Sequence, residues 1–240
     1  MRPEEKKLIP EMVLIPEGSF LMGSEEGPDN EKPVHAVWVD RFRIGKFPIT
    51  RSEYLIFMEA ASLPEPPFWR EEIFSEPDQP VVGISWHDAA GYCEWLSLVA
   101  GTSFRLPTEA ERERAARGGL EGKKYPWGDG LPWDRPYAGY NLRSGGPQPV
   151  GQNDPNGFGL YDMSEAVHEW CSDFYDPGYY GRSPEKNPQG PVEGKRQASR
   201  GGSWRHRIKF SRCSARSSLI STFRYADYGF RVASSLSSNR

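Results

Sequence analysis

Turn-forming residues constrain this chain more than any other feature of its sequence. The 240 residues include 25 glycines and 22 prolines, which favour turns because glycine adopts left-handed backbone angles and proline fixes φ. Between residues 118 and 200 there is no long periodic run of apolar residues. Eight tryptophans and an aromatic content of 13% still supply large side chains for a core. The sequence therefore predicts an ordered, loop-rich domain with few long elements.

Four segments are expected to contain short strands. Residues 12–22 indicate two strands around a Pro-Glu-Gly turn. Apolar and polar residues alternate over 34–44, which predicts one further strand. Residues 199–205 and 227–234 are predicted as two more strands near the C-terminal end.

Three helices are expected from their first residues. Thr50 is a good N-cap, and Glu53 three residues later completes a capping box. Ser85 and Thr108 are expected to be the N-caps of the second and third helices, and the third is expected to end at Gly118. Helices and strands together predict the α+β class.

The net charge of −3 argues against a nucleic-acid partner, because counterion release needs a basic surface. No apolar run approaches 18 residues, and the charged N-terminus has no hydrophobic stretch behind it. We therefore expect no membrane partner and a cytoplasmic location. Cys93, Cys171 and Cys213 lie far apart in the sequence, which favours three reduced, buried thiols over a disulfide or a zinc site.

A dozen short motifs then occur in a recognisable order. They include the following segments: Met12-Val-Leu-Ile-Pro-Glu-Gly-Ser-Phe-Leu-Met-Gly23, Pro80-Val-Val-Gly-Ile-Ser-Trp86, Arg105-Leu-Pro-Thr-Glu-Ala110, Asn156-Gly-Phe-Gly-Leu-Tyr-Asp162, Arg200-Gly-Gly-Ser-Trp204 and Gly229-Phe-Arg231. In this order they resemble the sulfatase-modifying-factor family, to which the formylglycine-generating enzyme belongs. The resemblance implies an elaborated C-type-lectin-like fold with twisted antiparallel sheets, few helices and much irregular structure. It places one domain at residues 12–235, between an extension at 1–11 and a tail at 236–240.

The resemblance also exposes a departure at the catalytic centre. In the formylglycine-generating enzyme, two copper-binding cysteines follow the serine of the Arg-Gly-Gly-Ser run by three and eight residues. Counting from Ser203, these positions hold His206 and Ser211. Copper(I) prefers soft thiolate ligands, so neither copper nor oxidation of sulfatase cysteines is expected here.

The alternative is a catalytic metal site at this position that uses histidines in place of the copper-binding cysteines. By resemblance His168 and His206 face the same cleft, with Ser203 and Ser211 as further candidate catalytic residues. Two histidines with a carboxylate as third ligand suit non-haem iron. No spacing in the sequence supports this ligand set, and histidines that are merely exposed or hydrogen-bonded are more common.

Calcium sites are also implied by the resemblance. The first would use the side chains of Asp162 and Glu169 and the backbone carbonyls of Glu165 and Val167, since calcium prefers oxygen ligands. The competing interpretation makes Asp162 a turn residue and Glu169 an ion-pair partner. A second site would use Asn141 and the carbonyl of Leu142, although the segment that carries its acidic partner is shorter here.

Basic residues gather after the Arg-Gly-Gly-Ser run. Trp204, Arg205, Arg207 and Lys209 are candidates for a ligand-binding cleft, and the guanidinium groups suit a carboxylate or phosphate ligand. Three other arginines are expected to be structural and to pair with carboxylates such as Asp173 or Asp227: Arg212, Arg216 and Arg231.

Three functions remain open from the sequence. The first is a calcium-stabilised module that binds a protein or a small, anionic ligand through its loops. The second is a metal-dependent oxidoreductase with a site around His168 and His206. The third is a non-catalytic relative that binds sulfatase-type peptides. Whether the chain is an enzyme is therefore undecided at this stage.

Overall fold

Short strands arranged in three sheets form the centre of the computed structural model, which describes residues 8–132 and 145–236. The described strands are β1 (Met12–Ile15), β2 (Gly18–Met22), β3 (His35–Val39), β4 (Phe42–Gly45), β5 (His168–Phe174), β6 (Gln197–Arg200), β7 (Ser217–Leu219), β8 (Tyr228–Gly229) and β9 (Ala233–Ser235). They form sheets in the orders β1-β4-β9, β2-β3 and β7-β6-β5-β8. All strand pairs are antiparallel except β5 with β8.

The predicted strand pair over residues 12–22 is confirmed, but residues 34–44 form two strands rather than one. β3 pairs with β2, whereas β4 pairs with β1. Asp40 lies between them, and its carboxylate accepts the indole N–H of Trp38. The alternation predicted one mostly apolar face that runs from Ala36 and Trp38 to Phe42 and Ile44, but in β3 the buried side chains are Val37 and Val39. The alternation was wrong because the chain changes sheets at Asp40.

The central strand β5 was not predicted. Its first four residues are all buried, so no alternation of apolar and polar residues marks it. The strand predicted over 199–205 is shorter, because Gly201 ends it with a φ of 101°. The strand predicted over 227–234 is two separate strands, β8 and β9, which lie in different sheets.

Three α-helices begin where the sequence predicted. They are α1 (Arg51–Ala61), α2 (Trp86–Ala100) and α3 (Glu109–Arg117), and each has a complete capping box at its N-terminus. Gly118 ends α3 in the left-handed conformation, as expected. Short 3-10 helices are η2 (Asp29–Glu31), η3 (Glu72–Phe74), η5 (Tyr179–Arg182) and η6 (Ile208–Phe210).

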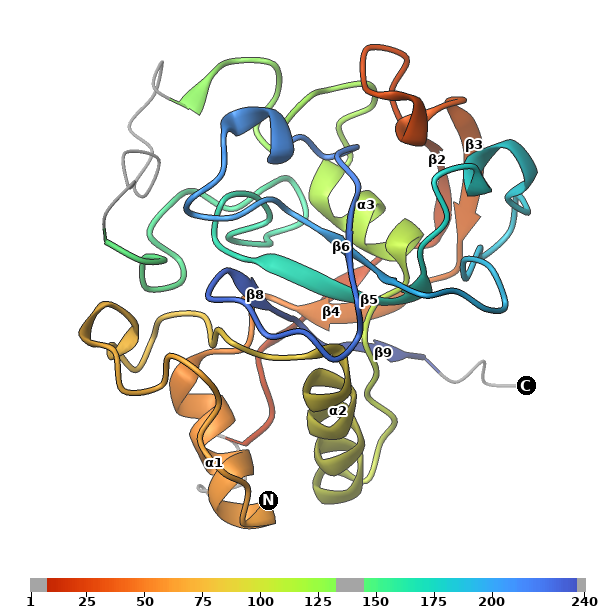
Figure 1. Cartoon of the computed structure of the whole chain (residues 1–240). Helices are drawn as coiled ribbons and strands as arrows, with labels where there is room; N and C mark the ends of the chain where they lie inside the picture. The colour runs from red at the N-terminus through yellow and green to blue at the C-terminus, as the bar shows by residue number, and fades with distance from the viewer. Residues whose placement is uncertain (1–7, 133–144, 237–240) are drawn as a thin grey trace.

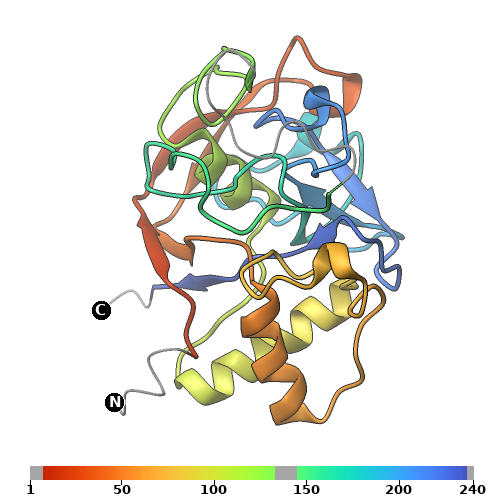
Figure 2. The same ribbon diagram turned by 90° about the vertical axis from the view of Figure 1, so that its left-hand side faces the viewer.

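The strands separate two groups of helices. Figures 1 and 2 show α1 and α2 together at one end of the molecule, with α3 on the other side of β4 and β9. One apolar core joins α1 and α2 to β5 through residues such as Tyr92, Trp170 and Phe230. A second core packs α3 against the first strands, around Ile15 and Ile44. The loop before β5 contributes Leu160 and Met163 to this second core, and the loop after β6 contributes Cys213.

The three cysteines are free and buried, as expected. Burial raises the pKa of each thiol, which keeps all three protonated at neutral pH. None of the helices in the described part of the chain is both long and apolar enough to cross a membrane.

Candidate metal centre

A pair of glycines turns the chain away from β6. Gly201 and Gly202 have φ of 101° and 67°, which residues with side chains rarely adopt. A Cβ atom on Gly202 would lie 2.6 Å from the hydroxyl oxygen of Ser211, so the turn has no room for a larger residue. The turn brings Ser203 and His206 against the loop that leads into β5.

Two histidine rings and one carboxylate meet beside this turn. Nε2 of His168, the first residue of β5, lies 2.8 Å from Nδ1 of His206. Asp227 lies just before β8, and its backbone carbonyl accepts the amide hydrogen of His168. One ligand atom from each of these three residues lies within 4.8 Å of the other two. Within residues 8–132 and 145–236, no other group of three His, Cys, Asp or Glu side chains is arranged closely enough to hold a metal ion.

Neighbouring donors fix the orientation of the Asp227 carboxylate. Oδ2 accepts a hydrogen bond from the Ser203 hydroxyl at 3.1 Å, and Oδ1 accepts one from Nη2 of Arg205 at 2.6 Å. Nε2 of His206 lies 3.5 Å from Oδ2. The Asp227 side chain is only 1% exposed, so the guanidinium charge offsets the cost of burying a carboxylate. The carboxylate is thereby held toward the histidine pair.

Burial keeps both imidazole rings neutral. It lowers the pKa of His168 to about 3, with a smaller contribution from His206 and an opposing one from Asp227. Burial is also the main cause of the lowered pKa of His206. Neutral imidazole is the form that binds a metal ion. Nδ1 of His168 is buried without a hydrogen-bond partner, so this ring interacts through Nε2.

The predicted catalytic residues are only partly brought together. His168, His206 and Ser203 lie around Asp227, whereas Ser211 is outside this group. The Ser211 hydroxyl is fully buried and has no hydrogen-bond partner. Sequence reasoning treated Asp227 only as an ion-pair partner of arginines. Its position just before the Gly-Phe-Arg motif was the signal that could have placed it in the cleft.

The residues predicted to form a ligand-binding cleft differ in their surroundings. Trp204 is half-buried and donates its indole N–H to the carbonyl of Ala226. Arg205 donates a hydrogen bond to the Asp227 carboxylate. Arg207 and Lys209 are exposed, and the ammonium group of Lys209 lies over the neighbouring Phe210 ring.

The first predicted calcium loop adopts unusual backbone angles. Asp162 and Glu165 have positive φ values of 55° and 72°, and Val167 is buried. Both carboxylate oxygens of Glu165 are buried without a partner, and burial raises the pKa of this group to about 8. The residues proposed for the second calcium site, Asn141 and Leu142, lie outside the described residues.

Glu169 does not offer a free carboxylate to this loop. Its two oxygens accept four hydrogen bonds, two from Arg112 at 2.6 and 3.0 Å and two from Arg231 at 2.7 and 2.9 Å. All three side chains are almost completely buried. The interpretation of Glu169 as an ion-pair partner is therefore confirmed.

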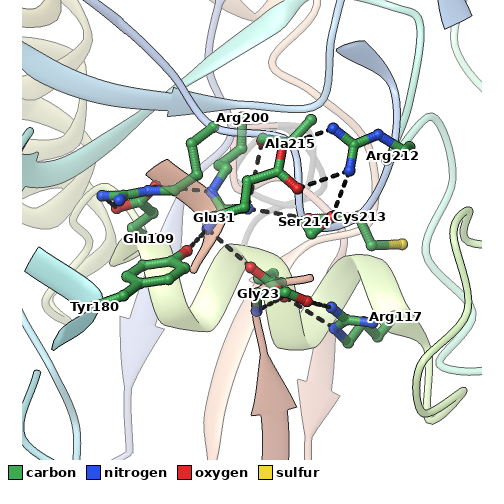
Figure 3. Close-up of polar contacts among 12 residues, drawn as sticks. Gly23, Glu31, Glu109, Arg117, Tyr180, Arg200, Arg212, Cys213, Ser214 and Ala215 are labelled. Carbon is green, nitrogen blue, oxygen red and sulfur yellow. Dashed lines mark hydrogen bonds and ion pairs between the residues drawn. The ribbon is translucent and has the colours of Figure 1, made fainter. Parts of the chain in front are cut away.

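The other two arginines predicted to be structural are also confirmed in that role, but with different partners. Arg212 binds both carboxylate oxygens of Glu31, as Figure 3 shows. Arg216 binds both carboxylate oxygens of Glu109 at 2.7 and 2.8 Å. The aspartates suggested from the sequence were wrong, because these arginines reach glutamates on distant segments.

Comparisons with known proteins identify relatives of this chain. The family model described as the sulfatase-modifying factor enzyme 1-like domain matches residues 1–236. The formylglycine-generating enzyme of Streptomyces coelicolor is 33% identical over 92% of this chain and 88% of its own length. A serine/threonine-protein kinase pkn1 of Chlamydia pneumoniae is 33% identical over 98% of this chain, which spans only 39% of that protein.

Among solved structures, PvdO from Pseudomonas aeruginosa has a TM-score of 0.82 and 30% identity, with 97% of each chain covered. Treponema denticola variable protein 1 has the same TM-score at 24% identity, which shows a shared fold. The predicted fold is thus confirmed: an elaborated C-type-lectin-like architecture with few helices and short, largely antiparallel strands. This chain belongs to the sulfatase-modifying-factor family.

Proposed function

We propose that this chain is a metal-dependent oxidoreductase whose ion is bound by His168, His206 and Asp227. The observation that carries the proposal is that ligand atoms of all three lie within 4.8 Å of one another. The two imidazole nitrogens are 2.8 Å apart, close to the separation of about 3 Å expected for neighbouring ligands at about 2.1 Å from one ion.

The ligand types favour non-haem iron. Iron(II) bound by two histidines and one carboxylate keeps open positions for dioxygen and substrate, and so supplies oxidation chemistry. Copper(I) fits less well because no thiolate lies in this group. His206 and Ser211 stand where the formylglycine-generating enzyme has its cysteines, so the proposed reaction is not oxidation of a sulfatase cysteine.

Residues around the three ligands have supporting roles in this proposal. Ser203 and Arg205 orient the Asp227 carboxylate, and such outer contacts commonly affect metal affinity by about 10- to 100-fold. Arg207 and Lys209 are exposed nearby in the sequence and would raise the local concentration of an anionic substrate.

A binding module without chemistry is the second candidate. It is supported by the same exposed cations and by the exposed ring of Phe210 beside them, which together suit an anionic ligand with a flat apolar part. A relative that binds sulfatase-type peptides without oxidising them would be one form of this candidate. Neither form needs a transition metal, so metal content separates the two proposals.

The test is metal binding to the full chain after purification without chelators. Wild type loaded anaerobically with iron(II) is expected to retain about one ion per chain after desalting, measured by mass spectrometry. His206→Ala and Asp227→Asn should lose it because each removes one of three ligands. His87→Ala is the matched control, since His87 lies on α2 and its Nε2 atom pairs with the Ser221 hydroxyl rather than with any of the three proposed ligands.

Two results would overturn the proposal. In one, wild type retains no iron, manganese, zinc or copper under these conditions. In the other, His206→Ala retains as much metal as His87→Ala. Either result would leave the binding module as the better interpretation and direct the search to anionic ligands.

A further inference from the structure

We propose that the guanidinium groups of Arg112 and Arg231 take the place of a calcium ion beneath the loop before β5. The family resemblance implies calcium at this position, with Asp162 and Glu169 as its carboxylate ligands. In this structure the Glu169 carboxylate accepts its hydrogen bonds from two arginines. This inference is independent of the proposed metal centre, which uses other side chains.

Arg112 reaches the loop from α3. Its Nε and Nη2 atoms donate to the two oxygens of Glu169, and Nη2 also donates to the carbonyl of Met163 at 2.9 Å. The same atom would lie 3.0 Å from a Cβ on Gly201, so the guanidinium group fills the space between the loop and the glycine turn. A calcium ion at the predicted site would need the Glu169 carboxylate at about 2.3–2.6 Å, and Arg112 already lies against both of its oxygens.

Arg231 closes the other side of Glu169. Besides its two hydrogen bonds to that carboxylate, its Nη2 atom donates to the carbonyls of Tyr161 at 3.0 Å and Asp162 at 3.3 Å. Its Nη1 atom donates to the carbonyl of Gly45 at 2.9 Å at the end of β4. Arg231 therefore binds carbonyls on both sides of Glu169, although these are not the Glu165 and Val167 carbonyls of the predicted calcium set.

The charges balance without an ion. Asp162 and Glu169 carry the two acidic groups of the predicted calcium set, and Asp162 lies close enough to interact electrostatically with both Glu169 and Arg231. Arg112 and Arg231 supply two positive charges, the same charge as one calcium ion. Glu169 is buried with two guanidinium partners, and a divalent cation would have to displace four hydrogen bonds on its carboxylate.

The primary test is the thermal unfolding midpoint of the full chain in EDTA and in excess calcium, with bound calcium counted by mass spectrometry. Wild type is expected to unfold at the same temperature in both solutions and to carry no calcium at this loop. An EDTA-induced fall of several degrees that persists in Asn141→Ala would overturn the proposal. So would one bound calcium per chain that persists in Asn141→Ala. Loss of calcium in Asn141→Ala would assign the ion to the other predicted site and leave the proposal standing.

A charge-removing variant provides the second test. Arg112→Met keeps a long side chain but frees Met163 and half of Glu169, so calcium should now raise its unfolding midpoint, by about 5 °C at saturating concentrations. Arg105→Met is the matched control, because it removes an arginine from a bidentate pair with Glu111 outside the loop. If folded Arg112→Met responds no more to calcium than Arg105→Met, then the guanidinium does not stand in for the ion. If Arg112→Met fails to fold, the wild-type measurement decides.

Discussion

At the scale of single residues, the partners of a buried carboxylate decide its chemistry. Asp227 is buried beside a guanidinium group and a hydroxyl, which hold it toward two neutral histidines. Asp173 is equally buried and accepts hydrogen bonds from the Glu109 amide and from Ser172. Burial and the nearby negative charge of Glu109 nevertheless raise the pKa of Asp173 to about 7. Asp173 therefore gains its proton at a higher pH than an exposed aspartate does.

Asp173→Asn should change how stability depends on pH. The folded-state pKa of Asp173 is above its unfolded value, so the stability that its proton contributes is complete below about pH 4 and is lost as the pH rises through about 7. The variant lacks this loss. We therefore expect its free energy of unfolding, measured in urea, to rise relative to that of wild type between pH 4 and pH 7. Asp40→Asn is a surface control, because the pKa of Asp40 is lowered. Parallel profiles for wild type and Asp173→Asn would contradict this expectation.

At the scale of elements, local sequence rules predicted the helices better than the strands. Helix starts depend on hydrogen bonds within four residues, and all three capping boxes are present. Strand limits depend on partners far along the chain. The change of sheets at Asp40 and the burial of both faces of β5 have no local signal. For this reason β3 and β4 were predicted as one strand, and β5 was not predicted.

Thr50→Ala should destabilise the protein by about 1 kcal/mol, or roughly 2–4 °C in the unfolding midpoint, because it removes the N-cap of α1. The Thr50 hydroxyl accepts the Glu53 amide hydrogen and donates to the Glu53 carboxylate. Thr50→Ser keeps the hydroxyl and serves as the control in thermal and urea unfolding. Equal stability of the alanine and serine variants would show that the cap contributes nothing here.

At the scale of the whole molecule, buried ion pairs join segments that are distant in sequence. Arg216 binds Glu109 across 107 positions and Arg212 binds Glu31 across 181. Figure 3 shows Glu31 with Arg212 beside Glu109 and Arg200, and Arg200 also binds the Glu109 carboxylate. Such pairs cost much desolvation, so each partner depends strongly on the other. They hold long loops in place where regular secondary structure is sparse.

Arg216→Ala and Arg224→Ala should therefore differ sharply in unfolding free energy. Loss of Arg216 leaves the buried Glu109 short of a partner, for an expected cost of about 3–5 kcal/mol. Arg224 pairs with Asp88 at the surface, where such a pair contributes about 1 kcal/mol or less. Urea unfolding of both variants measures the contrast, and similar costs for the two would refute it.

The sequence by itself determined the family, the fold class and the three helix starts. These features depend on motif order and on short-range hydrogen bonds. Only the tertiary structure decided that Asp227 joins His168 and His206, and that Glu169 faces two arginines. The physical reason is that these contacts join side chains separated by 20 to more than 60 positions, and the packing of the two cores brings them together.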